Sequence, residues 1–175
     1  MNNSTRNKTE IRKTSSFKTT IVYVVLPLTI ISSVSLFLRL FYFPYDIPLT
    51  HDAVGYFWYA IDTTVLENFP TDYSFPNTGW PMFLSLVFRI FDSNNFIDYM
   101  TIQRLSTIII STLTVIPVYF LCKKFFNNSL SLLGALLFAF EPHMIQNSLL
   151  GLTDTLYIFL ITVSFVLLQS SNKKL

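Results

Sequence analysis

The sequence predicts an all-α integral membrane protein with about four transmembrane helices and a long outer loop that contains interfacial helices. Composition is the first reason: 51% of the 175 residues are hydrophobic and only 13% are charged, whereas soluble domains carry about 25% charged residues. The second reason is that several apolar runs are long enough to cross a bilayer as helices. The net charge of +2 is too small to indicate nucleic acid as a partner.

The first 43 residues divide into a polar tail and an apolar run. Residues 1–20 are polar and basic without apolar periodicity, which predicts a disordered tail on the cytoplasmic side. Residues 21–43 contain one charged residue, Arg39, and would span roughly 35 Å as a helix. A signal peptide would have a shorter apolar region followed by a small-residue cleavage site. We therefore expect a transmembrane helix here.

The charges between the later apolar runs predict the topology. Residues 79–91 form a run of about a dozen apolar residues interrupted by Arg89, which suits an interfacial helix better than a span. If they lie in the interface, the basic tail and the lysine pairs at 123–124 and 173–174 fall on one side, as the positive-inside bias requires. Both termini are then cytoplasmic and residues 44–100 form an extracytoplasmic loop. The remaining expected spans are 101–122, 130–151 and 153–171 of a multi-pass protein of the cell membrane, or of the ER membrane in a eukaryote.

The expected outer loop keeps close to the membrane. Residues 52–68 lack proline and mix aromatic with spaced acidic side chains, which predicts a helix in the headgroup layer. Residues 69–81 are rich in Pro and turn-forming residues, which predicts an irregular segment. The chain then returns to the interface at residues 80–91.

Two acidic residues are the main candidates for a functional site. The predicted topology places Asp52, after the first span, and Asp154, between the third and fourth spans, on the outer face. Each could simply be an acid in the first turn of a helix, where the helix dipole stabilises a negative charge. Together they could instead bind a divalent cation or act on a substrate hydroxyl. His51, beside Asp52, is a candidate for substrate binding, or only a neighbour.

Three further charged residues lie in the expected spans. Glu141 falls near the middle of 130–151, where an acid costs about 2.5–3.5 kcal/mol on insertion scales. It could make a buried structural hydrogen bond, bind substrate, or belong to a proton relay or water-filled cavity, and Pro142 should kink the helix there. Arg39 and Arg104 lie near outer ends of spans, where arginines usually reach to lipid phosphate. Arg104 could instead bind the phosphate of a lipid-linked substrate.

The order of these features resembles the amino-terminal half of the GT-C-fold glycosyltransferases. That superfamily includes protein O-mannosyltransferases, lipid A aminoarabinose transferases and the catalytic subunit of oligosaccharyltransferase. The resemblance covers about residues 20–170. The features that carry it are Asp52 followed by Tyr56, the Trp80–Pro81 start of a short apolar helix, the span led by Arg104 that ends in lysines, and a span with a central proline, Pro142, that leads to Thr153–Asp154.

The resemblance implies a function. It implies transfer of a sugar from a polyprenyl-phosphate-linked donor to a protein or lipid acceptor on the extracytoplasmic face of the bilayer. Asp52 would act on the acceptor or bind a metal, and Asp154 would bind the metal, Mg or Mn, or the substrate. Many members have paired acids at both places, whereas here Ala53 follows Asp52 and Leu156 stands two residues after Asp154.

Two other classes of function stay open. One is a non-catalytic membrane subunit or a degenerate remnant of such an enzyme. The other is a transporter or channel subunit in which Glu141, His143 and Arg39 line an aqueous path.

Overall fold

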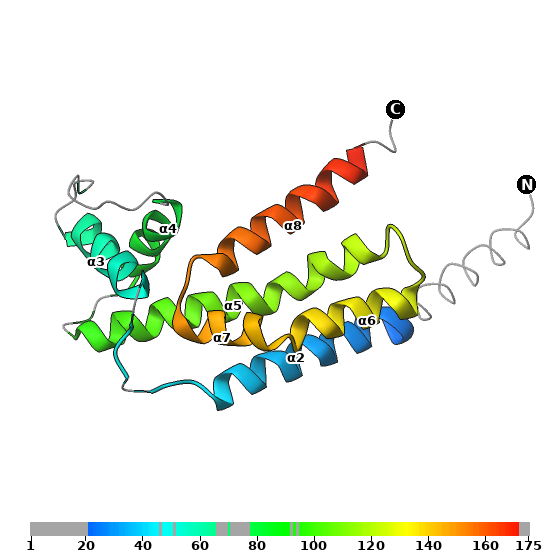
Figure 1. The fold of residues 1–175 in the computed structure, drawn as a ribbon, viewed down its shortest axis with the longest axis horizontal. Coiled ribbons are helices and arrows are strands. Elements are labelled where there is room, and N and C mark those ends of the chain that lie inside the picture. The colour runs from blue at the N-terminus through cyan, green and yellow to red at the C-terminus, as the bar shows by residue number, and fades with distance from the viewer. Residues whose placement is uncertain are drawn as a thin grey trace, which may run out of the picture.

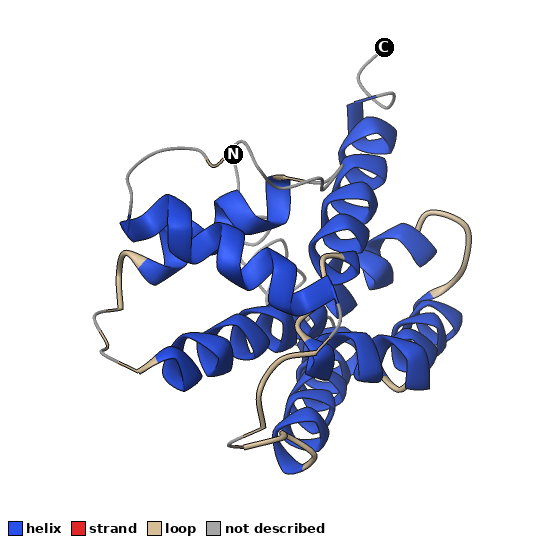
Figure 2. Ribbon diagram, turned by 60° about the vertical axis from the view of Figure 1, so that its left-hand side comes forward, coloured by secondary structure: helices blue, strands red, loops and turns tan. Residues whose placement is uncertain are grey.

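The computed structural model describes residues 21–45, 47–50, 52–65, 70, 78–91, 93 and 95–171. Within these residues every regular element is a helix, which confirms the all-α class (Figure 2). The helices are the short π-helix η1 (Ile21–Val25), α2 (Leu26–Phe41), α3 (Asp52–Val65), α4 (Gly79–Phe88), α5 (Phe96–Cys122), α6 (Asn128–Ala139), α7 (Pro142–Leu150) and α8 (Asp154–Ser171).

The long helices run back and forth along one axis. The start of α2, the α5–α6 connection and the end of α8 lie toward one end of the molecule, and α3 and α4 lie at the other (Figure 1). Val22–Phe41 and Phe96–Cys122 have the length and composition of membrane-crossing helices. Among the described residues, two of the four expected spans therefore meet this criterion, and the other two stay predictions.

The expected third span, 130–151, is interrupted. Proline disfavours helical backbone at the residue before it, and Glu141 is accordingly extended, with ψ of 120°. Helix α6 ends at Ala139 and α7 begins at Pro142, the first-turn position where a missing N–H costs nothing. The expected kink at Pro142 is thus a complete break. The expectation of a buried acid near the middle of a span was wrong, because Glu141 is exposed and caps α7, its Oε2 accepting from the Met144 N–H at 2.7 Å.

Helices α3 and α4 pack on each other beside the first turns of α5. A short helix expected at 79–91 is present as α4, which begins at Gly79, and its location in the membrane interface stays a prediction. Helix α5 begins at Phe96, five residues before the expected span, because the Asn95 side chain accepts from the Ile97 N–H at 3.0 Å and caps it. The turn-rich block 69–81 lies mostly outside the described residues. The shared core consists of Leu49, Ala53, Tyr56, Phe57, Ala60, Ile61, Trp80, Leu84 and Phe88.

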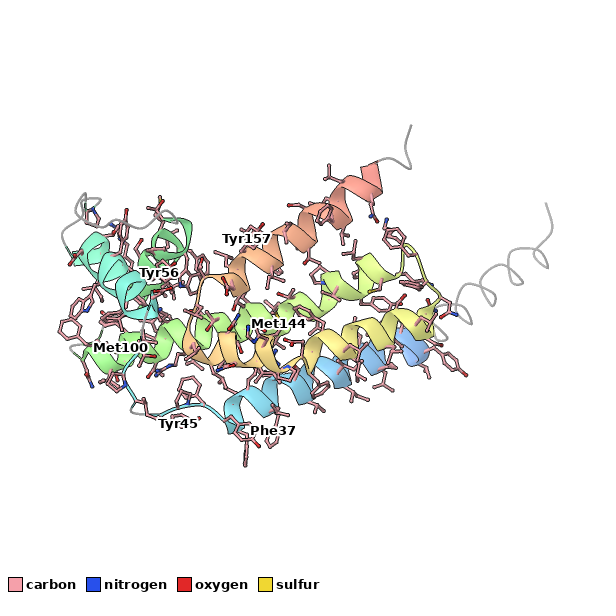
Figure 3. All side chains as sticks on the ribbon, viewed as in Figure 1. Phe37, Tyr45, Tyr56, Met100, Met144 and Tyr157 are labelled. Atoms are coloured by element: carbon pink, nitrogen blue, oxygen red, sulfur yellow. The ribbon has the colours of Figure 1, made fainter. Side chains whose placement is uncertain are left out.

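The outward faces of the long helices are apolar. Phe37 is 69% exposed and projects away from α2 (Figure 3), and Leu137 of α6 is 64% exposed. Contiguous exposed apolar surface on this scale indicates contact with lipid or with further protein rather than with water. By contrast, the inward face of α5 is polar, and its buried residues include Gln103, Thr107 and Ser111.

Candidate functional site

The first acid, Asp52, begins helix α3. Its side chain is exposed, and Tyr56 follows one turn later on the same side of the helix, only 7% exposed. Burial raises the pKa of the Tyr56 phenol, and the negative charges of Asp52 and Asp154 raise this pKa further. Both carboxylates therefore lie within electrostatic reach of one phenol, although about a hundred residues separate them in the sequence.

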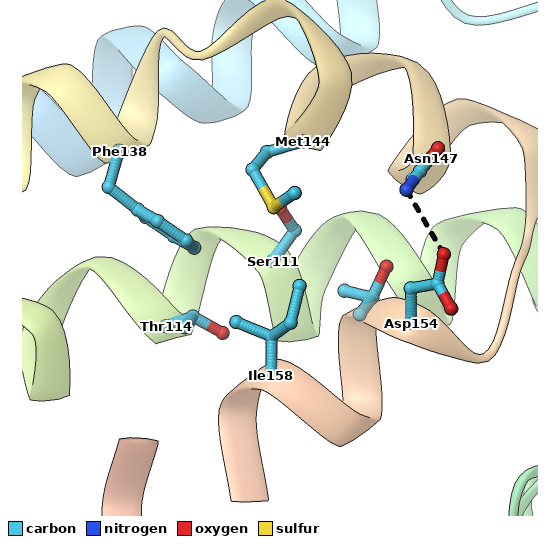
Figure 4. A pocket seen from close by; sticks show the side chains of 8 residues that line it. Ser111, Thr114, Phe138, Met144, Asn147, Asp154 and Ile158 are labelled. Atoms are coloured by element: carbon cyan, nitrogen blue, oxygen red, sulfur yellow. Dashed lines mark hydrogen bonds between the residues drawn. The ribbon is translucent and has the colours of Figure 1, made fainter. Parts of the chain in front are cut away.

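The second acid, Asp154, begins helix α8 after a tight turn. Gly151 ends α7 with φ of +78°, a left-handed conformation that glycine adopts without steric cost. The turn places Asp154 back beside α7, where the Asn147 Nδ2 donates to Asp154 Oδ2 at 3.2 Å (Figure 4). Asp154 is exposed on its other side. One carboxylate oxygen is thus held by an amide while the other stays accessible.

Asp154 borders two hollows. The smaller, of about 10 Å³, has room for about one water molecule. The larger, of about 510 Å³, opens between the start of α4 and the first turns of α8 and is large enough for a small ligand group. The smaller is lined by Ser111, Thr114, Phe138, Met144, Asn147, Asp154, Thr155 and Ile158 (Figure 4). The larger is lined by Thr78, Gly79, Trp80, Thr153, Asp154, Leu156, Tyr157 and Leu160.

Arg39 has a structural role. The expectation that it reaches toward lipid phosphate was wrong, because its side chain is fully buried. Its guanidinium donates to Ser148 Oγ at 3.2 Å, to Ser111 Oγ at 3.1 Å and to the Ala139 carbonyl at 3.1 Å, and also to the carbonyl and hydroxyl oxygens of Ser35. Polar partners on three other elements attract the side chain inward, and these partners cannot be identified from the local sequence.

Arg104 is also buried, at 4% exposure, so the expectation that it extends to the lipid surface was wrong. Its guanidinium donates to the carbonyls of Pro44, Ile47 and Pro48, the last at 3.0 Å. These contacts fix the segment between α2 and α3 that leads to Asp52. The geometry favours this supporting role, and the binding of a substrate phosphate by Arg104 stays a prediction.

The other candidates do not join this cluster. Glu141 and His143 are exposed at the start of α7, and Glu141 is engaged as the cap of that helix. Arg39 is enclosed by hydroxyl and carbonyl groups, so an aqueous path lined by all three is not formed by the described residues. His51 lies outside the described residues.

The two candidate ligands for a divalent metal are the carboxylates of Asp52 and Asp154. No group of three or more His, Cys, Asp and Glu side chains that could hold a metal occurs among the residues that the structure describes. Asp52 and Asp154 are both exposed, and their negative charges both raise the pKa of the Tyr56 phenol. Mg²⁺ is often held by one or two carboxylates together with substrate phosphates and water, and metal binding by Asp52 and Asp154 stays a prediction. The residue after Asp52, Ala53, is fully buried in the α3–α4 core, where a second acid could not reach such an ion.

Comparison with known families adds to this geometry. Residues 80–174, more than half of the chain, match the family model described as Oligosaccharyl transferase STT3, N-terminal. The chain belongs to this family. No curated protein and no solved structure matches the chain significantly.

Membership in the STT3 amino-terminal family confirms the resemblance to GT-C glycosyltransferases at the level of the superfamily. The family is an integral membrane family of the oligosaccharyltransferase type. The match begins at Trp80, so it contains Asp154 but not Asp52. The assignment of Asp52 to the site therefore depends on the geometry around Tyr56.

Sequence reasoning missed the inner polar face of α5. Gln103, Thr107, Ser111 and Thr114 recur every three or four residues, so they share one side of the helix, and all four are buried. Thr107 Oγ1 donates to the Ser148 carbonyl at 2.6 Å and joins α5 to α7. The signal was present as a polar stripe within an apolar run, but mean hydropathy conceals it.

Proposed function

We propose that this protein is a membrane glycosyltransferase that takes a sugar from a polyprenyl-phosphate-linked donor and transfers it to an acceptor on the extracytoplasmic face. The carrying observation is that Asp52 and Asp154 are both exposed at helix starts and that burial, together with their two negative charges, raises the pKa of the Tyr56 phenol. Asp154 also borders the hollow of about 510 Å³ beside α4. Membership in an oligosaccharyltransferase-type family supports this reaction class.

The chemistry would be displacement at the anomeric carbon. The bond from the acceptor to that carbon forms as the bond to the lipid phosphate breaks, and the phosphate leaves with the electron pair. Asp52 would orient or deprotonate the acceptor nucleophile, which requires an accessible carboxylate, and Asp52 is exposed. Asp154, fixed on one oxygen by Asn147, would present its other oxygen to a ligand in the hollow.

A divalent cation bound by Asp52 and Asp154 would stabilise the negative charge that grows on the departing phosphate. The protein supplies the two carboxylates and their fixed positions, and water and the substrate would complete the coordination. The hydrogen bond from Asn147 favours one orientation of the Asp154 carboxylate, which would reduce the entropy lost when a ligand binds.

Replacement of each acid by its amide tests the proposal. In the full-length protein in its native membrane, Asp52→Asn and Asp154→Asn should each lower the transfer rate by about 10²–10⁴-fold, because the amide keeps the size and loses the charge and the basicity. Membrane insertion should be unchanged. The assay follows the transfer of sugar from a polyprenyl-phosphate-linked donor to the acceptor.

Asp98→Asn is the matched control. Asp98 is also an exposed acid in the first turn of a helix, and its Oδ2 accepts from Ser93 Oγ at 2.6 Å, but it does not line the hollow. If the acids matter only as first-turn acids, all three variants should behave alike. Unchanged transfer by Asp52→Asn and Asp154→Asn would exclude the proposed roles.

A further inference from the structure

A buried glutamine connects the two segments that carry the acids. Gln103 of α5 is fully buried, and its Nε2 donates to the Ala53 carbonyl at 3.1 Å and to the Gly151 carbonyl at 3.0 Å. Ala53 is the residue after Asp52, and Gly151 stands three residues before Asp154. One side-chain amide therefore holds both acid-bearing segments at fixed distances from α5.

The chemistry of the contact requires an NH₂ group. Both partners are carbonyl oxygens, so each must receive a hydrogen, and a primary amide has two to give. The opposite orientation of the amide would direct Gln103 Oε1 at two acceptors, which is repulsive. In the present orientation Oε1 is buried and has no hydrogen-bond partner among the described residues. The two hydrogen bonds that Nε2 donates offset the free-energy cost of this unpaired acceptor.

The turn after α7 lies close to both the glutamine and the residues before α3. A Cβ atom at Gly151 would lie 3.4 Å from Gln103 Cγ, from Gln103 Nε2 and from Leu49 Cδ2. Leu49, 4% exposed, lies just before α3, so both the glutamine and the entry to α3 lie near the turn after α7.

We propose that Gln103 is a positioning residue that sets the separation of Asp52 and Asp154. Its catalytic meaning depends on the function proposed above, but its geometric part does not. Gln103 touches neither substrate nor carboxylate, and it acts through the backbone on either side. Because a misplacement of about 1 Å can lower a rate about a hundredfold, the separation is a quantity that the fold must control.

The separation can be measured without any activity. The native Cys122 is the single cysteine of the chain, so Cys122→Ser leaves a background in which Asp52→Cys and Asp154→Cys can carry spin labels. Pulsed electron paramagnetic resonance on the full-length protein in lipid nanodiscs then reports the distance between the two positions. Gln103→Met, which keeps the length of the side chain and removes both donors, should shift and broaden this distance distribution.

Three comparisons make the result specific. Gln146→Met is the matched control, because Gln146 is exposed on α7, and it should leave the distribution unchanged. A second label pair at the exposed Phe37 of α2 and Leu137 of α6 monitors the rest of the bundle and should not change in Gln103→Met. Gln103→Glu, which can donate at most one hydrogen, should act in the same direction if the methionine variant does not insert.

The kinetics separate this inference from the proposed function. In an unlabelled background, Gln103→Met should lower kcat by about 10–100-fold and leave KM for the donor nearly unchanged, since the binding groups remain. An unchanged distance between positions 52 and 154, or an equal change in both label pairs, would overturn the inference. Absence of transfer by the wild-type protein would refute the proposed function, while the distance measurement would still decide the role of Gln103.

Discussion

Replacement of Arg39 by methionine should destabilise the protein, although methionine is an apolar residue and α2 is an apolar helix. Its guanidinium joins α2 to α5 through Ser111, to α7 through Ser148 and to the end of α6 through the Ala139 carbonyl. The side chain is fully buried, so water cannot replace the lost donors. Methionine has a similar length but no hydrogen to donate, so the three helices lose their shared partner.

The magnitude follows from these three contacts between helices. Interhelical hydrogen bonds in membrane proteins contribute about 1 kcal/mol each, with wide scatter, which gives about 3 kcal/mol. Removal of a guanidinium from a buried site also removes its desolvation cost, which offsets part of the loss. We expect a net loss of about 2–3 kcal/mol, equivalent to about a 30- to 150-fold change in the unfolding equilibrium.

Equilibrium unfolding by SDS in mixed micelles, followed by far-ultraviolet circular dichroism, measures the free energy of unfolding. Arg89→Met is the matched control, because Arg89 is exposed at the end of α4 and should change the free energy of unfolding by less than about 0.5 kcal/mol. Arg39→Lys should recover little, since an ammonium group lacks the planar fork that reaches several partners. If Arg39→Met unfolds at the same SDS fraction as the wild type, the side chain does not hold the helices together.

Two further predictions concern the site. Tyr56 should ionise above its ordinary pKa near 10, and Asp52→Asn or Asp154→Asn should each lower the Tyr56 pKa, as measured by NMR of ¹³C-labelled tyrosine with Tyr56→Phe for assignment. Because the pKa of the phenol is higher in the folded state, the contribution of Tyr56 to stability is present below the ordinary pKa and is lost as the pH rises through the raised value. A Tyr56 pKa that neither variant changes would contradict the placement of the acids. Gly151→Ala should lower the free energy of unfolding by about 1–2 kcal/mol in the same SDS titration, because alanine is strained at φ of +78° and its Cβ would contact Gln103. An unchanged midpoint of the titration would show that the turn adjusts freely.

Some features of the fold could be predicted from local sequence because they depend on local physics. The break before Pro142 follows from the steric demand of proline on the preceding residue and from its missing N–H. The short helix that begins near Trp80 follows from an apolar run too short to cross a bilayer. The first span follows from length and composition. None of these features needs a distant partner.

The expectation on Glu141 failed for a local reason, and the one on Arg39 failed because its partners lie far along the chain. Glu141 was expected inside a helix because the apolar pattern continues past it, but the extended backbone before Pro142 turns it into a cap. Arg39 was expected at the lipid surface because its position near a helix end is typical of such residues. Its partners Ser111 and Ser148 are 72 and 109 residues away, and no local pattern identifies them.

The inner face of α5 accounts for the arrangement of the candidate site. Arg104 binds the segment that enters α3, Gln103 binds the first turn of α3 and the turn before α8, and Thr107 binds the end of α7. Each partner is a backbone carbonyl, so the contacts constrain where a segment runs and leave its side chains free to differ. A single helix can therefore position two acids on separate segments, while the outward face of the same helix, with exposed Ile109 and Leu113, remains as apolar as a lipid bilayer requires.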